Sequence, residues 1–508
     1  MFGEGTKPSH RNALHLRRLG ISTHQEAVVY MREDCHVCRS EGLTSHARVS
    51  LTRDDTTIIA TLHHVRGDLL RLGEAGLSEA AWEAIGGRDG DIVHVGHPPP
   101  LDSLSHVRAK TFGRRLDAAA LRAVIADVAA RRYADVHLAS FITACADGHL
   151  DRQEMGDLTR AMIEVGDRID WGHTPIADKH SIGGLPGNRT SPIVVAIVAA
   201  SGLTIPKTSS RAITSPAGTA DTMETLTRVD LDLPSMRRVV EREGGCLVWG
   251  GAVRLSPADD ILIRVERALD LDAEGQLVAS VLSKKAAAGA THLVLDIPVG
   301  PTAKVRSVAD AERLAGHLIA VSAVFGITAH ALLTDGTQPV GRGIGPALEA
   351  RDVLAVLQNA PNAPLSLRTK SIEIAGTVLE LAGASAEGAG VAQAEKTLQS
   401  GDAWRKFAAI CEAQGGMREP PRAACTHVLP SPGNGRVTAI DNRRLANAAK
   451  LAGAPDDKAA GVEIHVALDQ QVEKGEKLFT LHAETPAGIA YVLDYLASRP
   501  DIVQVGAE

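Results

Sequence analysis

Two stretches of the chain alternate short apolar runs with helical segments, and this alternation limits the possible folds more than any other feature. The stretches cover residues 172–256 and 290–424 and contain apolar runs such as Leu203–Thr208 and His292–Gly300. Strands that alternate with helices are typical of βα units, whose strands form a mostly parallel sheet. The sequence therefore predicts a larger α/β domain built from two separated segments.

A helical pattern occupies the stretches between and before these segments. Residues 101–171 carry apolar residues at the 3.6-residue spacing of helices, and residues 257–289 form a second helical stretch. We expect the two stretches to pack together as one helical domain. The cleft between this domain and the α/β domain is then the expected place for a functional site, with a hinge closure that brings the two sides together.

Each end of the chain is predicted to form a separate domain. Residues 1–100 contain short strands with a hairpin-like break at Arg53–Asp55, and they end in the linker Pro98–Pro100. Residues 425–508 combine a helix with strands in Gly461–Glu484, which predicts a small α+β domain.

Composition and charge narrow the class of protein. The chain of 508 residues is 44% hydrophobic and 23% charged, so disorder is not expected. Its longest apolar run has 11 residues, short of the roughly 20 that span a bilayer, and no apolar signal core is visible near residue 1. A net charge of −7 argues against a nucleic-acid partner, and six cysteines fit a reducing, cytoplasmic location.

The segment Asp178–Leu226 contains two transitions from a loop into a helix. Ser191–Pro192 is expected to open the first helix and Ser215–Pro216 the second, since serine caps helices well and proline suits their first turn. Both helix N-termini would point toward the carboxyl ends of neighbouring strands, where α/β sheets bind their ligands.

These two loops also bring hydroxyl groups and cations together. Free backbone N–H groups, hydroxyls and an ammonium group are what an oxyanion such as phosphate requires. Any one of these residues could simply cap a helix, but the whole set predicts a phosphate site that is neither a P-loop nor a GxGxxG turn. The set comprises Lys179, Ser181, Thr190 and Ser191 in the first loop, and Ser209, Ser210, Arg211, Thr214 and Thr219 in the second.

The segment resembles the signature region of the thymidine and pyrimidine-nucleoside phosphorylase family, in particular its long branch, which includes the AMP phosphorylases. The resemblance runs from about residue 101 to the C-terminus, and residues 1–100 are similar to the N-terminal extension of the long branch. It implies a pentosyltransferase in which inorganic phosphate attacks the anomeric carbon of a nucleoside or nucleotide and releases the base. It also implies no metal or organic cofactor, no membrane partner, and a homodimer or higher homo-oligomer.

The resemblance assigns roles to particular residues. The positions that match phosphate-binding residues are Lys179, Ser181, Ser191, Ser209 and Thr219. The loop Pro186–Ser191 is one residue longer than in short thymidine phosphorylases, so either Thr190 or Ser191 could correspond to the family's position. His180 matches a histidine beside the base, and Arg264, Ser280 and Lys284 match positions that hold a pyrimidine. Nucleotide-contacting positions correspond to Gly184, Ser210, Arg211, Ala212, Ile213, Thr214, Ser215, Thr219, Ser280 and Lys304, and the proposed proton donor to Asp272.

Elementary chemistry agrees with these roles. Negative charge grows on the base as the glycosidic bond breaks, so cations aimed at its carbonyl oxygens, Arg264 and Lys284, stabilise the transition state. A positioned acid can protonate the leaving base, and His180 or Asp272 could serve. Ser280 and Lys284 are four residues apart and therefore share one face of a helix.

The substrate stays open between two candidates. The pyrimidine positions favour a thymidine phosphorylase-like reaction, which gives thymine and 2-deoxyribose 1-phosphate. The long architecture and the run Ser210–Ser215 favour an AMP phosphorylase, which gives a free base and ribose 1,5-bisphosphate. A regulator that binds nucleotides without cleaving them is a third, non-enzymatic possibility.

Three further motifs can each be interpreted in more than one way. Cys35 and Cys38 form a CxxC pair that could bind zinc, exchange thiols or simply be structural. The glycine-rich run Val340–Ala350 is expected to be a turn that borders the pocket. Asp457–Ala459, followed by strands, is similar to the lysine motif of lipoyl or biotinyl carriers, although here the motif precedes its strands.

Overall fold

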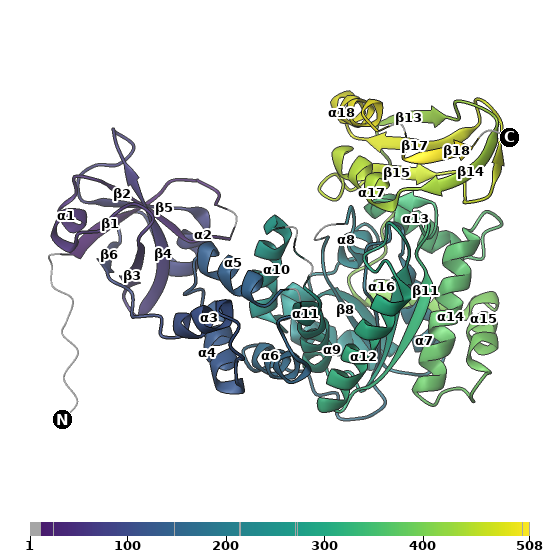
Figure 1. Ribbon diagram of the computed structural model, residues 1–508, viewed down its shortest axis with the longest axis horizontal. Helices are drawn as coiled ribbons and strands as arrows, with labels where there is room; N and C mark the ends of the chain where they lie inside the picture. Colours follow the sequence, from purple (N-terminus) through teal and green to yellow (C-terminus); the bar gives the residue numbers. More distant parts are fainter. Residues whose placement is uncertain are drawn as a thin grey trace. The chain divides into compact units, whose positions relative to one another are not determined.

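The computed structural model describes residues 12–23, 25–146, 148–212, 215–269, 271, 273–499 and 501–506 (Figure 1). The chain divides into two compact units. The first unit combines residues 1–112 with 126–141, and the second combines residues 113–125 with 142–508. The predicted division into four domains, with its boundaries, stays a prediction.

A closed β-barrel fills most of the first unit. Its strands are β1 (Ala13–Arg18), β2 (Val28–Arg32), β3 (Arg48–Arg53), β4 (Thr56–Val65), β5 (Glu74–Leu77) and β6 (Ile92–Gly96), joined in the order β1-β5-β2-β4-β3-β6. β1 pairs with β5 and β2 with β4 in parallel, and the other pairs are antiparallel. Alternate strand residues such as Leu14, Leu16, Val49 and Leu51 point into the barrel and make its core.

The CxxC pair lies in this barrel core. Cys35 is the N-cap of the short helix α1 (His36–Glu41), and its Sγ accepts the backbone N–H of Cys38 at 3.2 Å. Both side chains are buried. Within the described residues, no group of three or more histidine, cysteine or acidic side chains is placed to hold a metal ion. The pair therefore serves at least to cap and pack α1. A second helix, α2 (Glu79–Ile85), also packs on the barrel.

The second unit contains a parallel sheet, which confirms the predicted α/β fold. β11 (Thr328–Asp335), β10 (His292–Val299) and β7 (Ala177–Ser181) are hydrogen-bonded in that order, and β8 (Ile205–Ser209) pairs with β9 (Gly245–Trp249). A parallel bridge between Ile176 and Thr204 joins β7 to β8. The sheet thus has the order β11-β10-β7-β8-β9.

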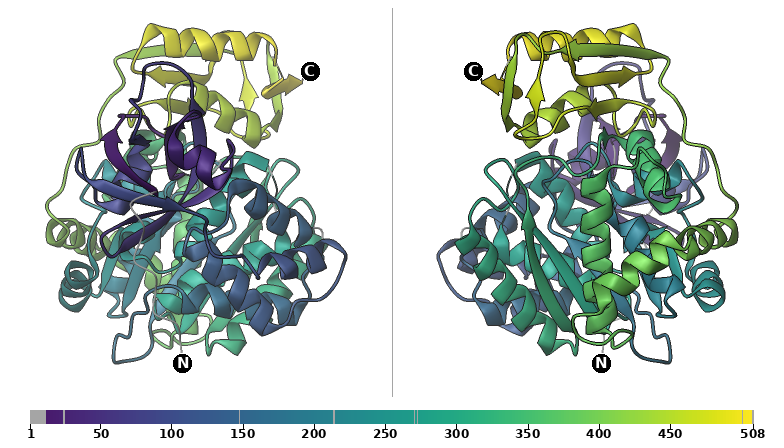
Figure 2. Two further views of the ribbon diagram at one scale, coloured as in Figure 1. Left: turned by 90° about the vertical axis from the view of Figure 1, so that its left-hand side faces the viewer. Right: turned by 90° about the vertical axis from the view of Figure 1, so that its right-hand side faces the viewer.

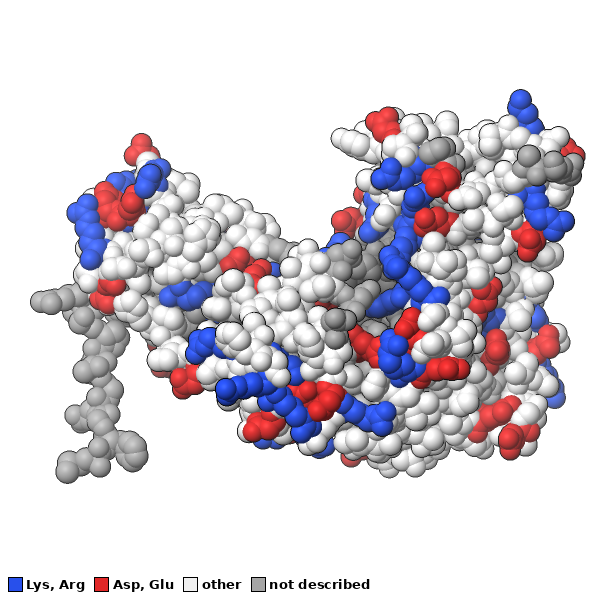
Figure 3. Space-filling model, in the orientation of Figure 1, with Lys and Arg blue, Asp and Glu red and all other residues white. Residues whose placement is uncertain are grey.

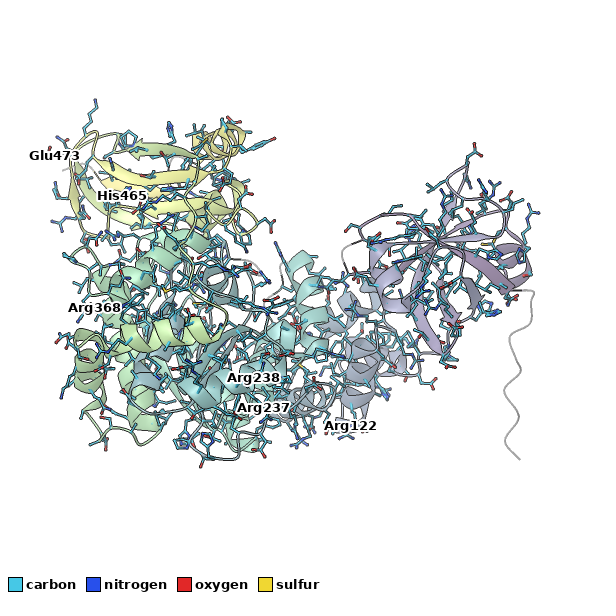
Figure 4. The ribbon with its side chains drawn as sticks, turned by 180° about the vertical axis from the view of Figure 1, so that it is seen from behind. Arg122, Arg237, Arg238, Arg368, His465 and Glu473 are labelled. Atoms are coloured by element: carbon cyan, nitrogen blue, oxygen red, sulfur yellow. The ribbon has the colours of Figure 1, made fainter. Side chains whose placement is uncertain are left out.

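Helices cover this sheet. They are α7 (Thr190–Ala200), α8 (Thr219–Glu224), α9 (Leu233–Glu243), α12 (Val308–Val324), α13 (Pro346–Leu357), α14 (Leu365–Leu381), α15 (Gly390–Gln399) and α16 (Asp402–Ala413). α7 is apolar on all sides and packs against α13, α14, α15 and α16, which is the environment expected of a fully buried helix. Arg237 of α9, labelled in Figure 4, lies over the ring of Trp171 and donates to the carbonyl of Asp170 at 2.8 Å.

The two loop-to-helix transitions begin elsewhere than the sequence predicted. α7 begins at Thr190 with Arg189 as its N-cap, and α8 begins at Thr219 with Gly218 as its N-cap. The prediction that Ser191–Pro192 and Ser215–Pro216 open these helices was wrong. Thr190 and Ser191 instead accept hydrogen bonds from Lys179, and the carboxylate of Asp221 caps α8 from within the helix.

The remaining helices are α3 (Leu104–Thr111), α4 (Ala118–Ala129), α5 (Asp135–Ala144), α6 (Arg152–Glu164), α10 (Pro257–Leu269) and α11 (Glu274–Ala287). α11 packs along α6, and α10 also contacts α6, although about a hundred residues separate them in the sequence. Gly275 of α11 lies directly against Leu150, where any side chain would clash. The second helical stretch therefore lies beside α6, as the helical pattern led us to expect.

The C-terminal segment forms an α+β arrangement (Figure 2). Its strands are β13 (Cys425–Pro430), β14 (Gly435–Ile440), β15 (Gly461–Ile464), β16 (Gln471–Val472), β17 (Lys477–Ala483) and β18 (Val503–Gly506), and its helices are α17 (Asn442–Leu451) and α18 (Pro486–Ala497). β12 (Gly343–Ile344), which precedes α13, pairs with β15. Backbone hydrogen bonds therefore join the C-terminal segment to the α/β segment. Among the described helices, none combines the length and apolar character needed to cross a membrane.

Candidate functional site

The order of the sheet reverses between β7 and β10. From β7 the chain proceeds to β8 and β9 on one side, and from β10 it proceeds to β11 on the other. Right-handed crossovers then place the helices that follow these two neighbours on opposite faces of the sheet. Ligands of such sheets bind in the crevice outside the carboxyl ends of the strands at this reversal. The last three residues of β7 are Lys179–Ser181, and Ser181 pairs with Asp296 within β10.

Lys179 is a buried cation held by two hydroxyl groups. Its Nζ donates to Thr190 Oγ1 at 2.6 Å and to Ser191 Oγ at 3.3 Å, so both hydroxyls of this pair contact the ammonium group. Burial lowers the pKa of Lys179 to about 8; the charge of Asp296 opposes this shift, while nearby cations add to it. The group is therefore a cation at neutral pH that lacks the water a lysine normally has.

Asp296 is the acceptor around which this part of the site is built. Its Oδ2 accepts from Ser181 Oγ at 2.8 Å and from Asn188 Nδ2 at 3.2 Å, and its Oδ1 accepts from Thr334 Oγ1 at 2.6 Å and lies 3.1 Å from Lys370 Nζ. Burial would raise the pKa of this carboxyl, but the charges of Lys370 and Lys179 and the hydrogen bonds hold it below its usual value. Asp296 therefore stays ionised and fixes Ser181.

Sequence reasoning missed Asp296, Asn188 and Lys370. A signal existed for Asp296, because it is the one acidic residue in the apolar run His292–Gly300. A charge is placed in such a strand only if partners surround it. For Lys370, on a helix far along the chain, the sequence offers no comparable signal.

Arg189 links the first loop to the second. Its Nε lies 2.6 Å from Glu349 Oε2, its Nη1 donates to Thr219 Oγ1 at 2.9 Å, and its Nη2 donates to the carbonyl of Ala217 at 2.9 Å. Thr222 donates to the same Glu349 oxygen at 3.0 Å. The predicted residue Thr219 is thereby tied to the loop that carries Lys179 and Ser191. Glycine-rich backbone borders this loop, because Gly187 (φ 70°) lies against the carbonyls of Val340 and Gly343.

Ser209 ends β8 with an unused hydroxyl. Its Oγ is buried and has no hydrogen-bond partner among the described residues. Buried hydroxyls are almost always paired, so an unpaired one next to the second loop is what a ligand-binding position requires.

A second buried cluster surrounds His180. Asp178 pairs with Lys207 at 3.1 Å and with Lys285 of α11 at 2.8 Å, so two ammonium groups share one carboxylate. Burial, together with the charges of Lys285, Lys207, Lys179 and Lys284, holds the pKa of His180 well below its usual value. His180 is therefore a neutral imidazole at neutral pH, and it lies within the electrostatic reach of α11.

The predicted base-binding residues lie on α10 and α11. Lys284 pairs with the buried carboxylate of Asp259. Arg264 lies one turn beyond Asp260 on α10, and Ser280 lies one turn before Lys284 on α11. A base that binds Lys284 must share this ammonium group with Asp259.

The predicted nucleotide-contacting residues fall in two places. Gly184 (φ 78°) lies directly against Lys304, since a Cβ there would be 2.5 Å from the Lys304 nitrogen, so these two positions are brought together. In the second loop, Asp221 accepts the N–H of Ala212 at 2.6 Å, and Ser215 Oγ donates to the carbonyl of Ala217 at 2.9 Å. The predictions for Ile213, Thr214 and Asp272 fall outside the described residues.

Figure 3 shows Lys and Arg side chains gathered near α8 and the C-terminal segment.

Three domain families match the chain. Residues 104–166 match the helical bundle domain of the glycosyl transferase family, and residues 173–404 match the a/b domain of the same family. Residues 436–501 match the pyrimidine nucleoside phosphorylase C-terminal domain.

Whole-length relatives and a solved structure extend these matches. "Putative thymidine phosphorylase 2" of Acidovorax sp. (strain JS42) is 61% identical over 97% of this chain and 96% of its own length. "Putative thymidine phosphorylase" of Hahella chejuensis is 57% identical over 98% of each chain. Anthranilate phosphoribosyltransferase from Thermus thermophilus shares the fold, with a TM-score of 0.51 and 20% identity over 61% of this chain and 98% of that one.

Fold, site and matches together define a pentosyltransferase. The predicted membership is confirmed: the chain belongs to the thymidine and pyrimidine-nucleoside phosphorylase family.

We predict that Asp296→Ala destabilises the protein strongly. The change leaves a buried ammonium group and three part-buried donors without their acceptor, and breaking a buried ion pair typically costs about 3–5 kcal/mol. Urea unfolding should show this loss in the free energy of unfolding. Asp335→Ala, at the exposed end of the neighbouring strand, is the matched control and should lose less than about 1 kcal/mol. Equal losses in the two variants would contradict the role given to Asp296.

Proposed function

We propose that this enzyme is a thymidine phosphorylase, which converts thymidine and phosphate to thymine and 2-deoxyribose 1-phosphate. The observation that carries the proposal is the buried Lys179, whose ammonium group contacts Thr190 and Ser191 at the reversal point of the sheet. A desolvated cation among hydroxyls is complementary to a phosphate dianion. The names of the relatives support the same reaction.

Phosphate is proposed to bind at Lys179, Ser181, Ser191, Ser209 and Thr219. These residues lie at the ends of β7 and β8 and at the starts of α7 and α8, and Asp296 and Arg189 fix two of them. Phosphate is itself the nucleophile in this reaction. We therefore propose that no metal ion or organic cofactor takes part.

The base is proposed to bind between His180 and the residues Arg264, Ser280 and Lys284. Because its pKa lies well below the usual value, His180 carries no imidazolium proton to give away at neutral pH. It can still donate an N–H hydrogen bond to a carbonyl oxygen of the base.

AMP phosphorolysis is the second candidate. Gly184 lies against the backbone of Lys304, and we propose that this lysine would serve a 5′-phosphate in such a reaction. The cytoplasmic location and the homo-oligomeric state stay predictions.

We expect the purified enzyme to release base from thymidine, and only when phosphate is present. A side-by-side assay on thymidine, uridine, AMP and CMP should give the highest kcat/KM with thymidine. A higher value with AMP would replace the first candidate by the second. Release of base from none of the four would contradict phosphorolysis altogether and favour a nucleotide-binding regulator.

Replacing Lys179 should impair the use of phosphate far more than the use of nucleoside. Lys179→Ala removes a charge-assisted hydrogen bond of about 1.5–3 kcal/mol, which corresponds to roughly a 10- to 150-fold rise in the KM for phosphate. In the unchanged enzyme this KM should also rise above pH 8, because the ammonium group loses its proton near that pH. The Lys179→Ala variant should lack this pH dependence. Thermal unfolding of the variant and of the unchanged enzyme shows whether the variant is folded. An unchanged KM for phosphate would refute the assignment.

Arg264→Ala and Lys284→Ala should lower kcat rather than only weaken nucleoside binding. Charge appears on the base only as the bond breaks, so a cation aimed at it contributes more in the transition state than in the ground state. Losing one such donor typically lowers the rate by about 10²–10³-fold. The two effects should not add, because both residues address one ligand. The measurement compares kcat and KM for the nucleoside at saturating phosphate. If both variants keep the wild-type kcat and change only KM, Arg264 and Lys284 are ground-state contacts and not catalytic residues.

A further inference from the structure

Lys458, in the motif Asp457–Ala459, contacts α8, the helix that follows the second loop of the site. It precedes β15, and its backbone carbonyl accepts the N–H of Ala347 at 3.0 Å, which fixes it to the start of α13. Its Nζ lies 3.3 Å from Asp221 Oδ1 and 3.0 Å from Glu224 Oε2, and both of these carboxylates belong to α8. The C-terminal segment thus places one ammonium group on two carboxylates of the α/β segment.

Asp221 closes the second loop. This carboxylate is buried, and its Oδ2 accepts the backbone N–H of Ala212 at 2.6 Å and that of Gly218 at 2.9 Å, which lie at the two ends of the loop. The ends meet so closely that a Cβ on Gly218 would be 2.5 Å from the carbonyl oxygen of Ser210. One side chain therefore sets the width of the loop at its base.

Arg211 competes for the same carboxylates. Its guanidinium donates to both oxygens of Glu224 at 2.7 Å, lies over the ring of Trp249, and is 3.5 Å from Asp221. Hydrogen bonds and charge from Arg211 and Lys458 lower the pKa of Glu224 to about 2. With Lys458 in place, two cations balance two carboxylates; without it, Arg211 alone must serve both.

We propose that Lys458 is a positioning residue that fixes the two ends of the second loop, at Ala212 and Gly218, through Asp221 and Glu224. Its ammonium group neutralises Asp221, so that this carboxylate holds the amides of Ala212 and Gly218 while Arg211 stays on Glu224 and Trp249. The effect on catalysis rests on the proposed phosphorolysis and on the predicted role of the run Ser210–Ser215 as nucleotide-contacting positions. The ion pairs also occupy the lysine that a carrier domain would expose for lipoylation or biotinylation.

Lys458→Met tests the proposal, because it keeps the apolar stem of the side chain and removes its charge. We expect the KM for nucleoside to rise about five- to tenfold, more than the KM for phosphate, since Arg189 holds Thr219 independently. Lys458→Arg should restore the KM for nucleoside to within about twofold, because a guanidinium reaches the same carboxylates. Lys474→Met, at an exposed lysine of the same segment, is the matched control and should change neither KM.

Hydrogen exchange gives a second readout that does not depend on any activity. Amides in the peptide 210–220 should exchange faster in Lys458→Met than in the unchanged protein or in Lys458→Arg, since the bonds to Asp221 weaken. If the unchanged protein released no base, the proposed function would be contradicted, but the faster exchange in Lys458→Met would still support the positioning role. The positioning role would be overturned if exchange in Lys458→Met were unchanged, or if Lys458→Arg were as impaired as Lys458→Met. An intact mass that shows a lipoyl or biotinyl adduct on the protein would overturn it as well.

Discussion

The carboxylate of Asp296 lies inside a parallel sheet, where a negative charge is stable only when donors surround it on every side. Those donors come from four separate parts of the chain: Ser181 at the end of β7, Asn188 in the loop that follows, Thr334 on β11 and Lys370 on α14. Satisfying one buried charge therefore gathers the elements that make the site. Because the same loop continues to Thr190, it also brings the hydroxyls that hold Lys179.

Buried charges of both signs surround this point. The buried cations include Lys179, Lys207, Lys285 and Lys370, next to the part-buried Arg189, and the buried carboxylates include Asp178, Asp221, Asp259, Asp296 and Glu349. Burial, to which nearby cations add, lowers the pKa of Lys179 to about 8 and holds the pKa of His180 well below its usual value. The phosphate dianion that we propose to bind here would add negative charge beside Lys179.

The sequence was enough to predict the α/β fold, the helical stretch beside α6 and the family, because each rests on a local pattern or a contiguous motif. It placed the starts of α7 and α8 wrongly, because Lys179 and Asp221 attract the groups that would otherwise form ordinary caps. It also missed Asp296 and Lys370, whose partners are distant in the sequence and adjacent only in the folded sheet. The roles of Arg264, Ser280 and Asp272 stay predictions, since they depend on a bound base.

The reversed order of the sheet has a consequence for how the chain is made. β7 and its neighbour β10 are separated by more than a hundred residues, which include β8, β9 and several helices. At synthesis rates of about 5–20 residues per second, β7 leaves the ribosome on the order of ten seconds before the strand that pairs with its other edge. During this interval the strand that carries Lys179 and Ser181 has an open edge, and the loop that carries Asn188 has no Asp296 to hold it. A nascent chain must protect that edge until β10 arrives, by early packing of α7 or with help from a chaperone.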